Sequence, residues 1–272
     1  MKAVSVIGAG TMGRGIAQVF ALRGYPVTLV DRSAEILSFA LERIKERTDP
    51  EAWEGVLQRI RTTTRLDAVS GADLAIEAVP EEIGLKKKVL KEVSVLLKKG
   101  AIIATNTSSI SIDSLSIAVT APERFIGMHF MNPPKVMRLV EVVRGEKTSD
   151  ETLSSIVGLV KKIDKTPTIS KDSPGFISNR LLFALIGEAM RLIQAGVADK
   201  ESIDTVMKAG MNHPMGPIEL ADFIGLDVCL EIMRTISDGL NDKRYAPPVV
   251  LENLVKEGKL GRKTGEGFYK YS

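Results

Sequence analysis

The 272-residue sequence has few of the residue types that many functional sites require. It contains one cysteine, Cys229, and two histidines, His129 and His213, so it supports neither an internal disulfide nor a cysteine and histidine cluster for a metal. Aromatic residues make up 5% of the chain and the net charge is +3, which does not favour a nucleic-acid surface of alternating basic and aromatic side chains. An anionic small molecule remains a possible partner.

Long apolar runs are also missing. No stretch reaches the roughly 18 apolar residues of a membrane-spanning helix, so we expect no membrane partner. Met1 and Lys2 lead into an apolar segment that Gly8 interrupts, which is too short for a secretory signal. With its single cysteine, the chain is expected to be cytoplasmic.

The first part of the chain alternates short β-branched runs with amphipathic stretches, which predicts a doubly wound, mostly parallel sheet covered by helices. The expected strands are 3–7, 27–30, 74–79, 101–104 and 125–128, with a further apolar run at 138–143. The expected helices are 12–23, 34–47, 82–98 and 151–162.

After Lys171 the β-rich runs disappear and helical spacing takes over, as in the run from Leu181 to Ile193. Asp172-Ser173-Pro174-Gly175 supplies the breaker residues typical of a junction. We therefore expect an α/β domain over residues 1–171 and a smaller all-helical domain over residues 172–272. Further helices are expected at 200–209, 217–239 and 248–256.

Gly8-Ala9-Gly10-Thr11-Met12-Gly13 follows the first expected strand and opens the first expected helix. In this context Gly8 permits a tight turn, Gly10 lets the backbone approach a pyrophosphate, and Gly13 lets the helix pack closely on the strand. The amides at the helix start would face the anion. The sequence predicts a Rossmann-type dinucleotide-binding domain; the alternative is a tight strand-to-helix turn without a ligand.

Asp31 ends the second expected strand, where a carboxylate can accept both hydroxyls of an adenosine ribose and repel a 2′-phosphate. This favours NAD over NADP, although Arg32 beside it could hold such a phosphate. Asp31 could instead cap the next helix.

His129 lies at the end of the expected strand 125–128, on the side where open sheets bind ligands. A reversal centred on Lys135 would place Glu141 directly opposite it on the next strand, because cross-strand partners share a face. A carboxylate on one imidazole nitrogen fixes the tautomer and leaves the other to take a proton, as oxidation of an alcohol requires. On spacing alone, a structural ion pair that holds a hairpin together is an equal alternative.

Several ordered motifs resemble the L-3-hydroxyacyl-CoA dehydrogenase family nearly end to end. They are the glycine motif, Ile76 to Glu81, Asn106 to Ser109, His129 to Pro134, Ser173 to Arg180, Met215 to Asp227 and Gly261 to Tyr269.

The resemblance implies NAD-dependent interconversion of an L-3-hydroxyacyl-CoA and its 3-oxoacyl-CoA, in fatty-acid or butanoate metabolism. It implies His129 as the base, Glu141 as its partner, and Ser108 and Asn179 as contacts of the reacting oxygen; it also places Glu81 near the nicotinamide half of NAD. The helical domain would close over an acyl-CoA substrate and pair two subunits in a homodimer. The residues expected to bind the cofactor are Gly8, Gly10, Thr11, Met12, Gly13, Asp31, Glu81 and Asn106.

One region departs from the family pattern. Members usually carry a longer helix-turn-helix after the second strand that contacts coenzyme A, whereas residues 34–65 are compact and interrupted at Thr48-Asp49-Pro50. Five basic residues could still meet nucleotide phosphates: Arg43, Lys45, Arg47, Arg59 and Arg61. We expect them, and the runs Lys86-Lys87-Lys88 and Lys98-Lys99, to be solvated surface charges.

Three alternatives stay open at this point. A gulonate-type hydroxy-acid dehydrogenase would share the histidine motif but take a sugar acid. A non-catalytic NAD-binding protein would keep the fold but need not retain His129 and Glu141. Hydroxyisobutyrate and phosphogluconate dehydrogenases use a catalytic lysine at the start of the second domain, where Ser178-Asn179-Arg180 offers none.

Overall fold

A computed structural model describes residues 1–271. The chain divides into two compact units, Met1–Ser173 and Pro174–Ser272. Among the described residues, no helix combines the length and apolar character needed to cross a membrane.

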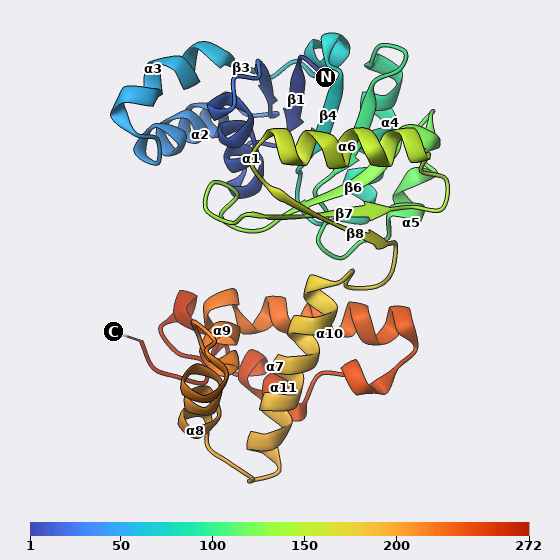
Figure 1. The fold of residues 1–272 in the computed structure, drawn as a ribbon. Coiled ribbons are helices and arrows are strands. Elements are labelled where there is room, and N and C mark those ends of the chain that lie inside the picture. The colour runs from blue at the N-terminus through green and yellow to red at the C-terminus, as the bar shows by residue number, and fades with distance from the viewer. Residues whose placement is uncertain (272) are drawn as a thin grey trace. The chain divides into compact units, whose positions relative to one another are not determined.

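The first unit is built on an eight-stranded sheet with the order β3-β2-β1-β4-β5-β6-β7-β8 (Figure 1). All neighbouring strands run parallel except β6 and β7, which are antiparallel. The strands are β1 (Val4–Ile7), β2 (Val27–Val30), β3 (Ile60–Thr63), β4 (Leu74–Glu77), β5 (Ile102–Thr105), β6 (Phe125–Phe130), β7 (Leu139–Arg144) and β8 (Thr166–Lys171).

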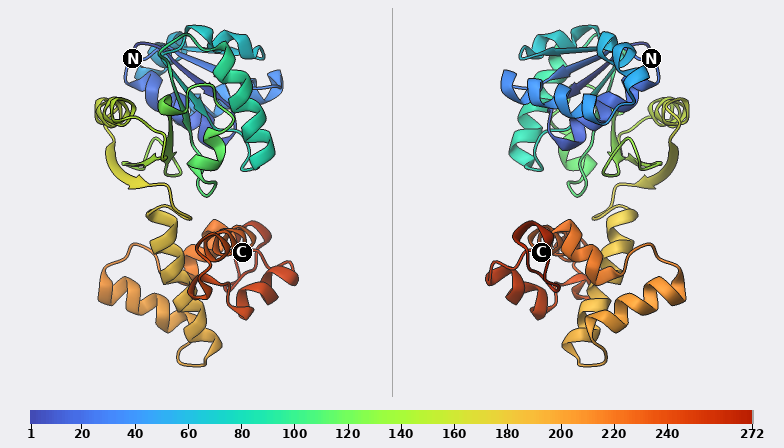
Figure 2. Two further views of the ribbon diagram at one scale, coloured as in Figure 1. Left: turned by 90° about the vertical axis from the view of Figure 1, so that its right-hand side faces the viewer. Right: turned by 90° about the vertical axis from the view of Figure 1, so that its left-hand side faces the viewer.

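Helices cover both faces of this sheet, as the two views of Figure 2 show. The helices of the first unit are α1 (Thr11–Leu22), α2 (Ala34–Glu46), α3 (Pro50–Arg59), α4 (Ile83–Leu96), α5 (Ile112–Ser116) and α6 (Asp150–Lys162). Apolar residues of α1, α2 and α6 join those of the central strands in one core cluster. This arrangement confirms the predicted doubly wound, mostly parallel fold.

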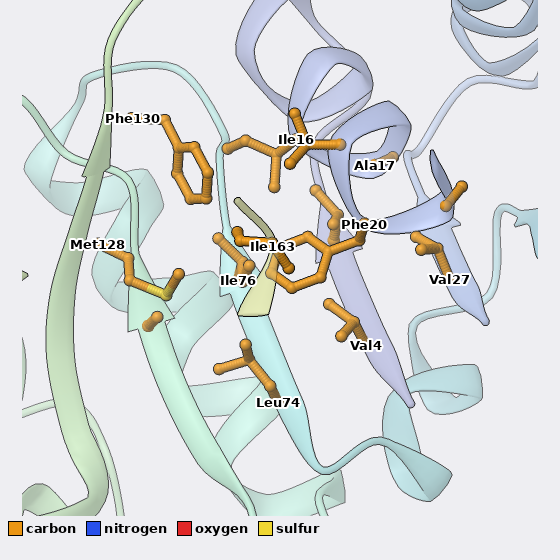
Figure 3. Close-up of a cluster of buried hydrophobic side chains, with 14 of the residues drawn as sticks. Val4, Ile16, Ala17, Phe20, Val27, Leu74, Ile76, Met128, Phe130 and Ile163 are labelled. Atoms are coloured by element: carbon orange, nitrogen blue, oxygen red, sulfur yellow. The ribbon is translucent and has the colours of Figure 1, made fainter. Parts of the chain in front are cut away.

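Phe20 of α1 lies at the centre of that cluster (Figure 3). Its ring meets the ring of Phe130 edge-on, with 6.5 Å between centroids, while Ile16 and Ile76 lie close by in Figure 3. Phe130 directly follows His129 on β6 and is fully buried. Because neighbouring residues of a strand face opposite sides, the packing of Phe130 helps to fix the direction of the imidazole.

Some elements differ from the sequence expectations. The edge strands β3 and β8 and the helix α3 were not expected, because their sequences are too polar to show a buried period. The expected helix 217–239 is wrong as a single element. It is broken at Gly225, whose φ of +106° lies outside the helical region, so α9 and α10 are separate.

The second unit consists of helices α7 (Ser178–Gln194), α8 (Lys200–Thr205), α9 (Pro217–Ile224), α10 (Leu226–Leu240) and α11 (Val249–Lys256). Two buried carboxylates tie its last residues to this helical core. Asp222 of α9 accepts from the backbone N–H groups of Phe268 and Tyr269, at 2.9 and 2.8 Å, and from the Tyr271 hydroxyl at 3.0 Å. Asp204 of α8 accepts from the Tyr269 hydroxyl at 2.8 Å.

These contacts explain the glycine at position 267 of the Gly261 to Tyr269 motif. A Cβ on Gly267 would lie 2.1 Å from the Asp222 carboxylate, so only glycine lets the backbone pass this close to Asp222. Burial and the Asp222 carboxylate raise the pKa of Tyr271 to about 12, so its phenol stays a donor at physiological pH. The motif therefore has a structural role in the second unit.

We expect Asp222→Ala to destabilise the protein by roughly 2–4 kcal/mol, because two partly buried N–H groups and a phenol lose their acceptor. The measurement is denaturant unfolding followed by circular dichroism. Asp238→Ala on α10, an exposed carboxylate, is the matched control and should change stability little. Equal stabilities of the two variants would contradict the role given to Asp222.

Candidate active site

The strands β1, β4, β5 and β6 end at one edge of the sheet, and most of the expected site residues of the first unit follow them. Gly8 follows β1, Glu81 lies between β4 and α4, Asn106 follows β5, and His129 lies next to the end of β6. Ligands of open α/β sheets bind at this carboxyl edge.

The glycine cradle has the geometry that a dinucleotide requires. Gly8 has a φ of +100°, and a Cβ on Gly13 would lie 1.7 Å from the Gly8 carbonyl oxygen, so α1 packs directly on the end of β1. A Cβ on Gly10 would have no neighbour within 4 Å, which leaves open space in front of the helix start. No side chain caps α1 and no acid lies in its first turn. Its amides are thus available to an anion, and the residues fit a pyrophosphate.

Asp31 stands beside this cradle. Its Oδ2 accepts from the Ala9 N–H at 2.8 Å, which fixes the carboxylate next to the glycine turn. The cap of α2 is Ser33, whose hydroxyl accepts from the Ile36 N–H, so the alternative of Asp31 as the helix cap is wrong. The position of Asp31 fits a hydrogen-bond acceptor for a ribose.

The antiparallel pair β6 and β7 brings His129 and Glu141 together. The register places the two residues directly opposite each other, as the reversal about Lys135 predicts. His129 Nδ1 lies 2.8 Å from Glu141 Oε2. The Glu141 side chain is 1% exposed and that of His129 is 10% exposed, so little water competes for this hydrogen bond. A buried carboxylate on Nδ1 sets the tautomer in which Nε2 exchanges the proton.

Asn106 supports this pair from the neighbouring strand. Its side-chain oxygen accepts from the Phe130 N–H at 2.9 Å, and its own N–H donates to the Glu77 carbonyl at 2.8 Å. The residue expected at the cofactor therefore also joins the ends of β4, β5 and β6.

Ser108 and Glu81 meet at the turn after β5. Glu81 Oε1 accepts from the N–H groups of Ser108 and Ser109, at 2.8 and 3.0 Å, and from the Thr107 hydroxyl at 2.6 Å. Burial acts to raise the pKa of Glu81, but the Lys86 charge and the hydrogen bonds from Thr107 and Ser108 outweigh it and hold the pKa below its usual value. Glu81 is therefore a carboxylate that orders the serine turn.

Lys86 is the residue that the sequence interpretation missed. We expected a solvated charge, but its side chain is 1% exposed and lies 2.7 Å from Glu77 Oε1 and 3.1 Å from Glu81 Oε2. A signal was present, because Lys86, Leu90 and Val93 occupy the buried stripe of α4 at helical spacing. The run of three lysines hid that period.

Asn179 belongs to the second unit, where it is the second residue of α7. The other expected catalytic residues, His129, Glu141 and Ser108, belong to the first unit.

A cavity of about 390 Å³ lies beside the glycine cradle, between α1, the end of α2 and the loop after β6. Four of its lining residues are cationic and none is acidic: Arg14, Arg43, Arg47 and Lys135. Burial, and the charges of Arg47 and Arg43, lower the pKa of Arg14. Arg43 also pairs with Glu46 at 2.7 Å, outside the lining. A concave surface with this excess of positive charge is suited to a polyanion.

Comparisons with known proteins agree over the whole chain. Residues 3–173 match the NAD binding domain of 3-hydroxyacyl-CoA dehydrogenase, and residues 175–271 match the C-terminal domain of the same family.

Similar proteins include a probable 3-hydroxybutyryl-CoA dehydrogenase of Deinococcus radiodurans, 47% identical over 98% of this chain and 99% of the relative. A 3-hydroxybutyryl-CoA dehydrogenase of Bradyrhizobium diazoefficiens is 46% identical over 100% and 96% of the two chains. The crystal structure of (S)-3-hydroxybutyryl-CoA dehydrogenase from Ralstonia eutropha superposes with a TM-score of 0.96 at 42% identity, covering 100% and 99% of the two chains.

Matches of this extent and identity, together with the cradle that fits a dinucleotide, settle the family, the enzyme class and the cofactor. The chain belongs to the 3-hydroxyacyl-CoA dehydrogenase family and is an NAD-dependent dehydrogenase.

Proposed function

We propose that the His129 and Glu141 pair removes the hydroxyl proton of an L-3-hydroxyacyl-CoA as the 3-oxoacyl-CoA forms, and returns it in the reverse direction. The observation that carries this proposal is the 2.8 Å contact between His129 Nδ1 and Glu141 Oε2, near the end of β6 at the same edge of the sheet that carries the cradle. An ion pair that only held the hairpin together could lie anywhere along the two strands, and would not need to lie at the edge of the sheet where ligands bind.

The roles of the side chains follow from the atoms that must move. The hydroxyl proton passes to Nε2 of His129 while the C3–H bond gives up its electron pair as hydride, so that C3 and its oxygen form a carbonyl. NAD, when bound, accepts this hydride. Glu141 holds the imidazole in one tautomer and stabilises the imidazolium that forms, while its own proton state is unchanged.

Ser108 and Asn179 complete the proposed site as donors to the C3 oxygen. A hydroxyl and an amide can both hydrogen-bond an oxygen that alternates between alcohol and ketone. Ser108 is supported by its placement at the carboxyl end of β5, and Asn179 by the family motif alone. Gly8, Gly10, Thr11, Met12, Gly13, Asp31, Glu81 and Asn106 form the proposed surface for the cofactor.

The substrate is proposed to be a short-chain acyl-CoA, as the names of the similar 3-hydroxybutyryl-CoA dehydrogenases suggest. The basic cavity supports a coenzyme A thioester over a free sugar acid, because a single carboxylate needs one cation whereas nucleotide phosphates can engage several. We further propose that residues 1–171 bind NAD and that residues 172–272 contribute to substrate binding and pair two subunits in a homodimer.

The direct test of the function is consumption of NADH with acetoacetyl-CoA, compared with a longer 3-oxoacyl-CoA and with NADPH. We expect the highest kcat/KM for acetoacetyl-CoA with NADH. If no 3-oxoacyl-CoA supports NADH consumption, the proposal fails.

Replacing the proposed base should slow proton transfer without changing the binding of the cofactor at the glycine cradle. We expect His129→Gln to lower kcat roughly 10²- to 10⁴-fold, the range typical of a lost general base. The measurement is steady-state kinetics with acetoacetyl-CoA, together with NADH affinity from fluorescence titration, which should stay near the wild-type value. Wild-type turnover in this variant would remove His129 from the mechanism.

Glu141→Gln tests the contribution of the Glu141 carboxylate while the proposed base, His129, stays in place. The amide keeps the shape of the side chain but can hold the wrong tautomer and carries no charge for the imidazolium, so kcat should fall roughly 10²-fold or more. Measured KM values should change less than kcat. If Glu141→Gln lowers thermal stability but leaves kcat intact, Glu141 serves only to hold the hairpin.

The cavity gives a further prediction, for the double variant Arg43→Gln, Arg47→Gln. Each charge-assisted hydrogen bond to a phosphate contributes about 1.5 kcal/mol or more, so kcat/KM for acetoacetyl-CoA should fall roughly tenfold per arginine. Acetoacetyl-pantetheine lacks the nucleotide and should be used as well by the variant as by the wild type.

Lys45→Gln is the matched control, because Lys45 is an exposed cation of the same helix that does not line the cavity. It should leave both substrates unaffected. An equal loss for the CoA and pantetheine thioesters would show that the two arginines do not contact the nucleotide.

A further inference from the structure

Lys86 occupies a position that is unfavourable for a cation. It lies in the first turn of α4, where the helix dipole repels positive charge, and its side chain is completely buried. Lys88, two residues further along the same helix, is exposed. Burial of an ammonium at a helix start requires compensating partners.

The Lys86 ammonium has one oxygen partner for each of its three N–H groups. Its three N–H donors face three oxygens: Glu77 Oε1 at 2.7 Å, Glu81 Oε2 at 3.1 Å and the Val79 carbonyl at 3.1 Å. Lys86 thus joins the end of β4, the loop after it and the start of α4 through one atom, Nζ.

The second oxygen of each carboxylate accepts hydrogen bonds from β5 or from the turn that follows it. Glu77 Oε2 accepts from the Thr105 hydroxyl at the end of β5, at 2.6 Å. Glu81 Oε1 accepts from the turn 107–109, which includes Ser108. The printed contacts lead from Lys86 through these two acids to the serine turn. Without the shared cation, the buried Glu77 carboxylate and the partly exposed Glu81 carboxylate would repel each other.

We propose that Lys86 is a positioning residue: by neutralising Glu77 and anchoring Glu81, it holds the turn 107–109 and places Ser108 for the acyl group. The structural part of this inference needs only the ligand-free chain, whereas its catalytic consequence rests on the proposed function of Ser108.

Lys86→Met keeps the length of the side chain but removes its charge. In the ligand-free protein, we expect faster amide hydrogen exchange in a peptide covering residues 105–111, because Ser108 and Ser109 donate to a carboxylate that has lost its anchor. Kinetically, kcat/KM for acetoacetyl-CoA should fall roughly tenfold to hundredfold, as small displacements of a positioning group do.

The pH profile provides a readout that a purely structural role would not move. The wild-type pKa of Glu81 lies below its ordinary value of 4.5, so the carboxylate stays ionised as the pH falls toward that value. Without Lys86 this pKa rises, so activity of the variant should be lost at a higher pH than in the wild type and should recover as the pH is raised. Lys86 is the charged group paired with Glu81, and the same ammonium also pairs with Glu77.

Lys88→Met is the matched control and should leave exchange, kinetics and the pH profile unchanged. If Lys86→Met does not fold, the double variant Glu77→Gln, Lys86→Met removes one acid with the cation and is measured in the same way. Unchanged exchange at 105–111, or an unshifted pH profile, in a folded variant would overturn the proposal. If the wild type shows no activity with any acyl-CoA thioester, the proposed function is contradicted. The hydrogen exchange of residues 105–111 would still decide whether Lys86 holds the serine turn.

Discussion

The antiparallel pairing of β6 with β7 is the constraint on which the proposed chemistry depends. In a sheet that is otherwise parallel, this one reversal places an acid directly across from His129 and buries both. A parallel neighbour would require a long crossover, and its register would not follow from a short loop. The reversal is in turn held in place from both sides, by Phe130 packed on Phe20 and by Asn106 bonded to the Phe130 backbone.

The sequence predicted this arrangement because its signals are local. Strand, glycines and helix are contiguous at the cradle, and the distance from His129 to Glu141 is set by one short loop. The expectations failed where the deciding contact is remote. Edge strands such as β3 and β8 have one neighbour each, so they need little apolar sequence. In the sequence, Gly225 cannot be distinguished from a glycine inside a continuous helix. In the structure its positive φ separates α9 from α10.

Lys86 shows why charged residues are the hardest to predict. Its burial depends on Glu77 and Glu81 and on the turn after β5, which lies far along the chain. The same holds for the cavity, since Arg14 comes from α1, Arg43 and Arg47 from the end of α2, and Lys135 from the loop after β6. The helical spacing of Lys86 with Leu90 and Val93 indicates a buried position, but a local window of sequence does not identify the partners that such charge clusters draw from distant segments. They become visible only through the geometry that gathers them.

The buried carboxylate of Asp222 has a consequence for work on the protein itself. Because Phe268, Tyr269 and Tyr271 donate to it, this segment is held to the helical core of the second unit. Removing residues from Tyr269 onward would take away two of these donors and leave the Phe268 N–H on the buried carboxylate.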